Sequence, residues 1–387
     1  MNGWWEMLPA APGAAWDWAG LRSVRPFGAL MDAMARIPQN PAWHGEGDVW
    51  THTRMVCETL TVLPAWEALP EENRRILALA ALLHDIGKVR CTRMEEGVPV
   101  SPQHGLIGAQ MARELLWREL DLAGIAERQA LREAVCWLIR YHTAALYLFE
   151  REEPERRVRV LSLIGTRAPD FTLGNLCLLS EADVLGRVTD QQRERLEQVE
   201  LSREQAREAG CLEGPYPFPS PATARAYAAG RRVAPDQELY DASWGEVILL
   251  CGLPGTGKDS WLAREHPGLP QVCLDELRGR MGVDARDNQG RVVQAAKEQA
   301  RGFLRAHEPF AWNATCVSPR TRTELVSLFE NYGARVRIVW LETGWEENLR
   351  RNRERPASVP ESAVGIMLGR LEPPLPGDAW QVNWRIV

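Results

Sequence analysis

Apolar residues recur every three or four positions through the first 210 residues, which is the spacing of amphipathic helices. One run comprises Leu77, Ala80, Ala81, Leu82 and Leu83, and another comprises Leu106, Ala109, Ala112, Leu115 and Leu116. Asp48 stands where it would cap a helix, and the sequence Ser101-Pro102 is expected to begin another helix. The pattern predicts an all-α domain over residues 1–210.

The pattern changes after residue 243. Short runs rich in Val and Ile at residues 246–251, 271–274 and 335–341 are predicted strands, and helical segments lie between them. Strand alternating with helix is typical of an α/β domain with a parallel sheet. Residues 211–243 lie between the two domains and contain a proline-rich stretch from Gly214 to Pro221, so they are predicted to form an ordered or semi-rigid linker.

Composition narrows the class of protein. The chain has 387 residues, 45% of them hydrophobic, which is enough for sizeable cores. No apolar run approaches the ~20 residues of a membrane span, the N-terminus does not resemble a signal peptide, and the eight cysteines form no CxxC pair. We therefore expect a cytoplasmic protein with reduced thiols and no membrane contact.

The charge balance limits how the chain can bind a polyanion such as a nucleic acid. The formal net charge is −6, and the residues from Trp244 onward carry 19 basic and 18 acidic side chains. Neither part is a bulk polyanion binder, so any nucleic-acid contact must use a local groove.

Histidine and aspartate gather in the helical part, each at or near a different predicted helix. The candidate ligands are His52, His84, Asp85, His104, His142 and Asp183. Imidazole and carboxylate groups are the ligands of divalent metals that activate water, and a mainly imidazole set favours Mn, Co, Ni, Cu or Zn over Mg. Any one histidine alone would be an ordinary core or surface residue, and His44 is open between a supporting and a surface role.

The local contexts of these residues resemble the HD phosphohydrolase superfamily. The matching segments are His52-Thr53, His84-Asp85-Ile86-Gly87-Lys88, His104-Gly105-Leu106-Ile107-Gly108-Ala109, Tyr141-His142 and residues 181–187, while the lead-in at residues 40–53 is similar to the HD domain of bacterial tRNA nucleotidyltransferases. The resemblance implies two metals, one held by His52, His84, Asp85 and Asp183. The second would be held by His104 and His142, with Asp85 bridging.

Only three lysines stand among 46 basic residues, and two of them lie in motifs. Lysine is a compact point charge, unlike the fixed fork of arginine. Within the resemblance, Lys88 would neutralise a phosphate oxygen, although a solvated lysine at a helix end is the alternative.

The other motif lysine closes a phosphate-binding loop. The spacing G-x-x-x-x-G-K is met by Gly252, Gly255, Thr256, Gly257 and Lys258, directly after a predicted strand. Such a loop cradles nucleotide phosphates with its backbone N–H groups, and the lysine reaches the β- and γ-phosphates. Asp259 follows where a Ser or Thr normally binds Mg²⁺, so the metal ligand is open between Asp259 acting through water and Ser260.

Asp275 and Arg278 follow the second predicted strand of this domain and resemble a pair in polynucleotide kinases of the bacteriophage type. There the aspartate takes the proton of a 5′-hydroxyl and the arginine holds the neighbouring phosphate. Phosphoryl transfer to an alcohol requires a carboxylate beside the attacking oxygen. The alternative role of Asp275 is a helix N-cap. The sequence Trp312-Asn313-Ala314-Thr315 at a strand end also resembles this group.

Residues 348–355 are a candidate lid over the phosphates. Arg351 and Arg355 are expected on one helix face, where either would close over the transferred phosphate, unless the run is a solvated face.

In domain order the whole chain resembles the HD-Pnk family of bifunctional end-healing enzymes. The resemblance implies removal of 3′-phosphate or 2′,3′-cyclic phosphate by the HD domain and phosphorylation of 5′-OH ends of RNA or DNA by the kinase, with ATP or another nucleoside triphosphate and Mg²⁺. A ligase would act downstream. The alternatives are a nucleotide phosphohydrolase fused to a metabolite kinase, and a nucleotide sensor without turnover.

Overall fold

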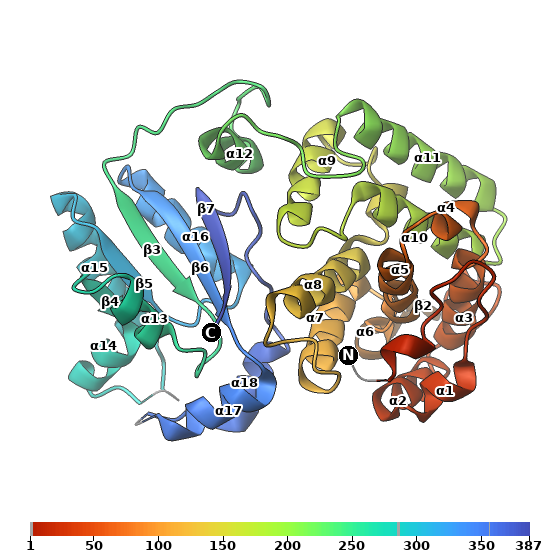
Figure 1. Ribbon diagram of the computed structural model, residues 1–387, viewed down its shortest axis with the longest axis horizontal. Helices are drawn as coiled ribbons and strands as arrows, with labels where there is room; N and C mark the ends of the chain where they lie inside the picture. Colours follow the sequence, from red (N-terminus) through yellow and green to blue (C-terminus); the bar gives the residue numbers. More distant parts are fainter. Residues whose placement is uncertain (1–2, 285–286, 356) are drawn as a thin grey trace. The chain divides into compact units, whose positions relative to one another are not determined.

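The computed structural model describes residues 3–284, 287–355 and 357–387, which form two compact units (Figure 1). A helical unit comprises Met1–Ala123 and Glu127–Tyr216, and an α/β unit comprises Gly124–Ala126 and Pro217–Val387. The fold class predicted from the sequence is confirmed: a helical domain precedes an α/β domain with a parallel sheet.

The helical unit is built from helices joined by short turns. Its helices are α1 (Trp18–Ser23), α2 (Arg25–Met34), α3 (Val49–Leu60), α4 (Pro64–Glu67), α5 (Glu71–Leu83), α6 (Lys88–Cys91), α7 (His104–Arg118), α8 (Ala126–Tyr141), α9 (Pro154–Ser162), α10 (Leu173–Leu185) and α11 (Gln192–Glu208), with 3-10 turns η1 (Trp5–Met7), η2 (Ala144–Leu146) and η3 (Leu163–Thr166). Helix α5 lies at its centre, because every residue from Ile76 to Leu83 is buried.

The observed start of one helix agrees with the prediction from the sequence, and the start of another does not. Asp48 caps α3 as predicted, since its carboxylate accepts from the N–H of Thr51. The predicted cap at Ser101 is wrong: α7 begins at His104 after Gln103, whose φ is 57°. The Ser101 carbonyl instead accepts from the His104 ring, so this segment orients a site residue.

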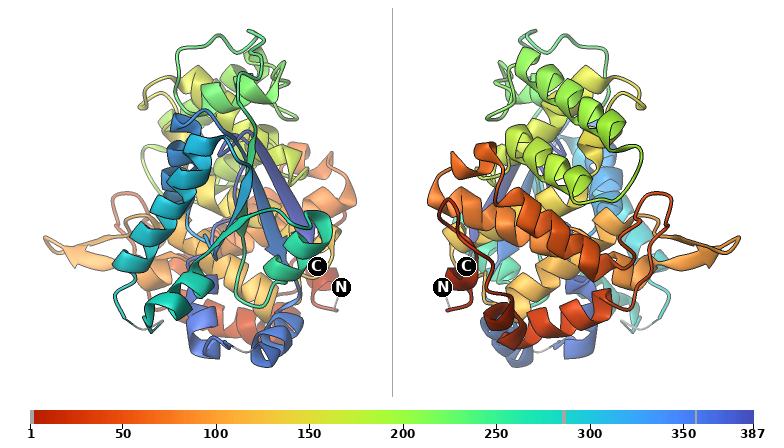
Figure 2. Two further views of the ribbon diagram at one scale, coloured as in Figure 1. Left: turned by 90° about the vertical axis from the view of Figure 1, so that its left-hand side faces the viewer. Right: turned by 90° about the vertical axis from the view of Figure 1, so that its right-hand side faces the viewer.

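A β-hairpin interrupts the helical unit, which the sequence did not predict. Strands β1 (Arg93–Glu95) and β2 (Val98–Val100) pair in antiparallel fashion. Figure 2 shows that the hairpin extends away from the surrounding helices. It connects α6 to α7 and so separates the His84–Asp85 segment from His104 along the chain.

The α/β unit has a five-stranded parallel sheet in the order β4-β5-β3-β6-β7. Its elements are α12 (Pro221–Ala228), β3 (Glu246–Cys251), α13 (Lys258–Glu265), β4 (Gln271–Cys273), α14 (Leu274–Met281), α15 (Gly290–Ala306), β5 (Phe310–Asn313), α16 (Pro319–Asn331), β6 (Arg335–Glu342), α17 (Trp345–Glu354), α18 (Glu361–Leu368) and β7 (Gln381–Ile386). The central strand β3 is buried from Val247 to Cys251, and the loop that follows it carries the phosphate-binding motif.

The segment at residues 211–243 is not uniform. Residues 214–220 are irregular, and α12 then begins at Pro221 with Ser220 as its cap. Arg225 of α12 binds Glu330 of α16 through bonds of 2.7 and 2.9 Å, which attaches this helix to the α/β unit. The compact units divide after Tyr216, inside the segment. The division into a domain, a linker and a second domain stays a prediction.

No helix in the described part of the chain is both long and apolar enough to cross a membrane. The eight cysteines are all free.

Candidate functional site

The helical unit brings all six candidate metal ligands into one buried cluster. They come from three helices and two turns: His52 lies in α3, His104 begins α7 and Asp183 lies in α10, while His84 and Asp85 lie in the turn after α5 and His142 follows α8. All are buried except His104, whose side chain is 23% exposed. His104 therefore marks the side of the cluster that a substrate can reach.

Three of the four imidazoles are fixed by a hydrogen bond at the Nδ1 atom. Backbone carbonyls three residues earlier accept from His84, His104 and His142 at 2.8, 2.9 and 2.8 Å, respectively. His52 Nδ1 lies 2.9 Å from Glu46 Oε1, within ion-pair distance. Burial alone would lower the pKa of His52, but the Asp183 and Glu46 carboxylates outweigh it and raise that pKa. Because a carbonyl oxygen only accepts, Nδ1 of His84, His104 and His142 carries the proton and the Nε2 lone pair of these three rings is directed into the cluster, as in metal-binding histidines.

The inward Nε2 atoms face one another in two pairs. The His52 and His84 atoms lie 3.4 Å apart, and those of His104 and His142 lie 3.2 Å apart. The lone pairs of His104 and His142 repel at this distance unless a cation lies between or beside them, and each Nε2 pair lies close to an oxygen of Asp85. The donor set therefore fits two metal positions.

Asp85 stands between the two histidine pairs. Its Oδ2 atom lies 3.4 Å from His84 Nε2 and 3.7 Å from His52 Nε2, while Oδ1 lies 3.7 and 3.9 Å from the Nε2 atoms of His104 and His142. Oδ1 is buried and has no hydrogen-bond partner among the described residues. Each oxygen thus faces one pair, which is the arrangement required of a bridging carboxylate.

Asp183 completes the first group and is held by an arginine. Its Oδ1 atom lies 3.0 Å from His52 Nε2 and 3.9 Å from His84 Nε2. Arg187 donates to both carboxylate oxygens, through Nε to Oδ1 at 3.1 Å and through its terminal nitrogen to Oδ2. Burial alone would raise the pKa of Asp183, but Arg187 and His52 outweigh it and hold that pKa well below its usual range.

Electrostatics keeps the second histidine pair neutral. Burial and the neighbouring His104 and His84 lower the pKa of His142 to about 3, and burial also lowers the pKa of His104. Neutral imidazole is the form that binds a metal.

Lys88 is buried rather than solvated at a helix end. Its Nζ atom lies 2.6 Å from Asp85 Oδ2 and donates to Gln39 Oε1 at 2.6 Å. Its charge therefore lies beside the bridging carboxylate.

The sequence analysis missed Glu46, Arg187 and Gln39 as parts of this site. Glu46 Oε1 accepts from His44 at 2.8 Å and lies 2.9 Å from His52 Nδ1, and its other oxygen accepts from the Val188 N–H at 2.9 Å. These contacts place His44 in a supporting position. Burial opposes ionisation of Glu46, but the three bonds hold its pKa well below the usual range. For Arg187 the available signal was its i, i+4 spacing from Asp183.

The second candidate site lies in the α/β unit, at the carboxyl end of β3. Gly252, Gly255 and Gly257 have φ values of 145°, 88° and 78°, which side chains rarely adopt. A Cβ atom on Gly255 would lie 2.6 Å from the Asn348 carbonyl oxygen of α17. The loop thus has the backbone of a phosphate cradle and packs closely against α17.

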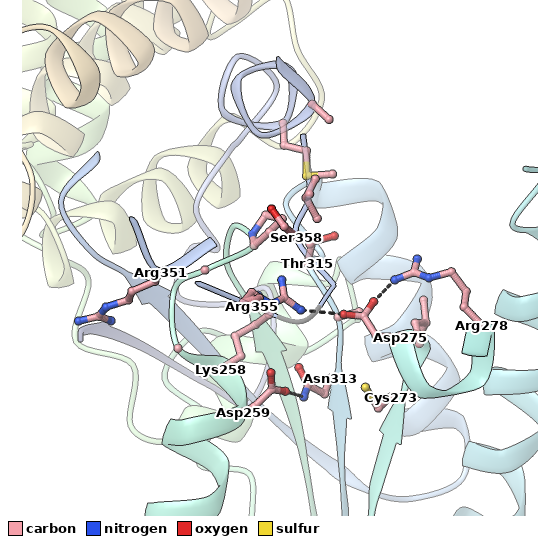
Figure 3. A pocket seen from close by; sticks show the side chains of 18 of the residues that line it. Lys258, Asp259, Cys273, Asp275, Arg278, Asn313, Thr315, Arg351, Arg355 and Ser358 are labelled. Carbon is pink, nitrogen blue, oxygen red and sulfur yellow. Dashed lines mark hydrogen bonds and ion pairs between the residues drawn. The ribbon is translucent and has the colours of Figure 1, made fainter. Parts of the chain in front are cut away.

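The loop lysine and its neighbour have different partners. Lys258 Nζ donates to the carbonyls of Gly252 and Leu253 at 3.0 and 2.9 Å, respectively. Burial, reinforced by Arg355, lowers the pKa of Lys258 to about 8. Asp259 accepts from the Asn313 amide at 2.5 Å, and both line the cavity together with Ser260 (Figure 3).

This cavity has a volume of about 1110 Å³ and contains the predicted reacting groups. Asp275 is the second residue of α14, whose N-cap is Cys273, so Asp275 is not the cap. It is paired with Arg278 and accepts from Arg355 at 3.0 Å (Figure 3). A carboxylate flanked by two guanidinium groups therefore lies in the same cavity as the phosphate loop.

The prediction that Arg351 and Arg355 share a helix face is wrong. Helix α17 ends at Glu354, so Arg355 lies beyond it and turns to Asp275. Arg351 pairs with Glu347 of its own helix at 2.6 Å, and in Figure 3 its side chain extends away from Asp275. The following segment is fixed by Asn352, which bonds both backbone groups of Val359.

The fold and the two clusters define a chain in which an HD-type helical domain precedes a P-loop α/β domain. Comparison with known proteins agrees: the family model described as HD domain matches residues 48–164, and the model described as AAA domain matches residues 247–374.

Curated relatives are distant. The chain is 27% identical over 214 residues to a "Multifunctional CCA protein" of Xanthomonas campestris pv. campestris (strain B100), covering 51% of this chain and 46% of that protein. It is 32% identical over 128 residues to a "Multifunctional CCA protein" of Halorhodospira halophila (strain DSM 244 / SL1), covering 32% and 27%. The chain thus spans less than half of the length of these relatives. Together the matches support an HD domain followed by an AAA domain in this chain.

Proposed function

We propose that this protein heals broken nucleic-acid ends. The helical unit would remove a 3′-phosphate or open and remove a 2′,3′-cyclic phosphate, and the α/β unit would phosphorylate a 5′-hydroxyl end. The observation that carries the proposal is the pairing of a two-metal ligand set in one unit with a P-loop cavity holding an arginine-flanked carboxylate in the other.

In the helical unit, His52, His84, Asp85 and Asp183 would hold one metal, and His104, His142 and Asp85 the other. A bound transition-metal pair supplies hydroxide near neutral pH and neutralises charge on the phosphate. Glu46 and the backbone carbonyls keep the imidazoles oriented. Arg187 holds Asp183 in place, and Lys88 lies beside Asp85, where it can pair with a phosphate oxygen that enters.

In the α/β unit, residues 252–258 would bind the phosphates of the nucleoside triphosphate. Lys258 would exchange its two carbonyl partners for phosphate oxygens. The oxygen of the 5′-hydroxyl forms a bond to the γ-phosphorus, the bond from that phosphorus to the β–γ bridging oxygen breaks, and Asp275 accepts the hydroxyl proton. Arg278 would hold the phosphate next to the 5′ end. Arg355, which contacts Asp275, would stabilise the transferred group in preference to Arg351.

The size of the cavity favours a substrate in addition to the nucleotide. Its volume of about 1110 Å³ lies above the range of roughly 300–1,000 Å³ that is usual for a single small ligand. The nearly balanced charge of residues 244–387 instead favours the second candidate, a metabolite kinase. The two functions differ in whether a polynucleotide end is accepted.

The test uses one oligonucleotide that bears 5′-OH and 3′-phosphate ends, incubated with ATP and either Mg²⁺ plus Mn²⁺ or a chelator. We expect a 5′-phosphate and a 3′-hydroxyl in the metal-containing reaction and neither after chelation. A parallel reaction with a free nucleoside addresses the second candidate. Phosphorylation of the nucleoside and not of the oligonucleotide would overturn the end-healing proposal.

A further inference from the structure

The inference concerns two positions beside the phosphate loop. In P-loop enzymes Mg²⁺ is commonly held by a neutral Ser or Thr hydroxyl after the loop lysine and by an aspartate at the end of a neighbouring strand. Here the residue after Lys258 is Asp259. Asn313 ends β5, which pairs directly with the loop strand β3 in the register Leu250↔Asn313. Compared with the common arrangement, the negatively charged side chain is therefore on the loop helix and the neutral side chain is at the end of the strand.

The two side chains are in direct contact. The Asn313 amide nitrogen donates to Asp259 Oδ1 at 2.5 Å and lies 3.3 Å from Gln271 Oε1 (Figure 3). These contacts orient the amide nitrogen of Asn313 away from a cation and leave its carbonyl oxygen as the possible ligand. Asp259 retains its second carboxylate oxygen, and both residues line the cavity that contains Lys258.

A carboxylate at this position works against nucleotide binding unless a cation lies between it and the phosphates. Asp259 is the second residue of α13, so the helix N-terminus stabilises its charge. The same N-terminus must also receive the phosphates of the nucleotide. Like charges at such short range repel, and a divalent ion bound by both groups converts this repulsion into attraction.

We propose that Asp259 and Asn313 form the Mg²⁺ seat of the nucleotide site, with the charged ligand on the loop helix and the neutral ligand on the strand. The proposal rests on the nucleotide-binding part of the proposed function. It makes Asp259 an ion ligand and gives Ser260 no such role.

The test measures the affinity of the non-hydrolysable analogue AMP-PNP by calorimetry, once in excess Mg²⁺ and once in EDTA. In the Asp259→Asn variant of the full chain, we expect binding in Mg²⁺ to weaken at least about tenfold, in the range usual for coupling between sites. Binding in EDTA should become tighter, because the repelling charge is gone. The Ser260→Ala variant removes the alternative ligand, and its AMP-PNP affinity should still depend on Mg²⁺ as in the wild type.

A second variant restores the usual arrangement of charges. Asp259→Ser combined with Asn313→Asp should recover most of the Mg²⁺ dependence that Asp259→Asn loses, and it keeps the test decisive if the single variant does not fold. Two results would overturn the proposed Mg²⁺ seat without contradicting the proposed kinase. One is an AMP-PNP affinity that depends equally on Mg²⁺ in the wild type and in Asp259→Asn, and the other is loss of this dependence in Ser260→Ala. If the wild type binds no AMP-PNP at all, the proposed kinase fails and the seat fails with it.

Discussion

At the scale of single residues, the metal cluster depends on a carboxylate that is not itself a proposed ligand. Glu46 lies 2.9 Å from His52 Nδ1, within ion-pair distance, and is in turn held by His44 and the Val188 N–H. Partners of this kind set the tautomer and orientation of a ligand histidine and commonly contribute 10- to 100-fold in metal affinity.

We therefore expect Glu46→Gln to weaken metal binding by about 10- to 100-fold, because the neutral amide holds the His52 ring less firmly. The measurement is metal content after dialysis against buffers of graded free Mn²⁺. Glu58→Gln changes an exposed carboxylate in α3, the helix that contains His52, and serves as the control. Unchanged metal retention in Glu46→Gln would show that the His52 ring is held by its surroundings alone.

Substitutions of Asp275 and of Lys258 should affect the kinase reaction in different ways. Asp275 would touch only the attacking hydroxyl, so Asp275→Asn should retain AMP-PNP affinity while 5′-end labelling falls by about 10²–10⁴-fold, the usual contribution of a general base. Lys258→Met should reduce both turnover and nucleotide affinity. Glu276→Gln, one residue along and exposed, should label normally. Near wild-type labelling by Asp275→Asn would assign the proton acceptor elsewhere.

At this scale the sequence predicted residue types but not their partners. The six metal-ligand candidates were found because they stand in short motifs. The contact of His52 with Asp183 spans 131 positions, and that of Glu46 with Val188 spans 142. Local spacing carries no information about such pairs. The prediction of a shared helix face for Arg351 and Arg355 was wrong for a related reason. The residue at which α17 ends depends on the contacts that Asn352 and Arg355 make in the folded unit.

At the scale of elements, the phosphate loop and α17 form one closely packed pair. Asn348 donates to the Pro254 carbonyl at 3.0 Å, and Gly255 has no room for a side chain beneath the Asn348 carbonyl. This contact explains why a glycine is required at a position that the motif spacing leaves free.

Gly255→Ala should therefore destabilise the α/β unit by at least about 1–2 kcal/mol, the usual cost of a left-handed conformation for a residue with Cβ. Nucleotide binding should also weaken, because either the loop or α17 must move. The matched control is Gly302→Ala in α15, where a Cβ meets no atom within 4 Å; it should leave stability unchanged or raise it by about 0.5–1 kcal/mol. Calorimetric unfolding of both variants checks this difference, and equal melting temperatures would contradict it.

Element types were predictable where periodicity is strong. The strand at Glu246–Cys251 and the parallel sheet followed from short apolar runs between helical segments. The hairpin of β1 and β2 and the edge strand β7 were missed, because their exposed or mixed positions give no clean alternation. Helix α12 was hidden by the prolines around it, although its Ser220-Pro221 start is a regular cap.

At the scale of the whole molecule, the two candidate sites belong to separate compact units. Every proposed ligand of the transition-metal pair lies in the helical unit, and every residue that lines the nucleotide cavity lies in the α/β unit. The chemistry of the sites also differs, since one offers mainly imidazole nitrogen and the other mainly oxygen.

This separation predicts that each activity can be removed alone. His84→Ala takes one Nε2 atom from the buried cluster, so 3′-phosphate removal should fall to background while 5′-end labelling stays within about twofold of wild type. Lys258→Met should give the opposite result. Both activities are measured on one oligonucleotide with 5′-OH and 3′-phosphate ends, and circular dichroism confirms that each variant is folded. A folded His84→Ala protein that lost both activities would mean that the metal cluster serves the kinase as well, and the two-site proposal would have to be abandoned.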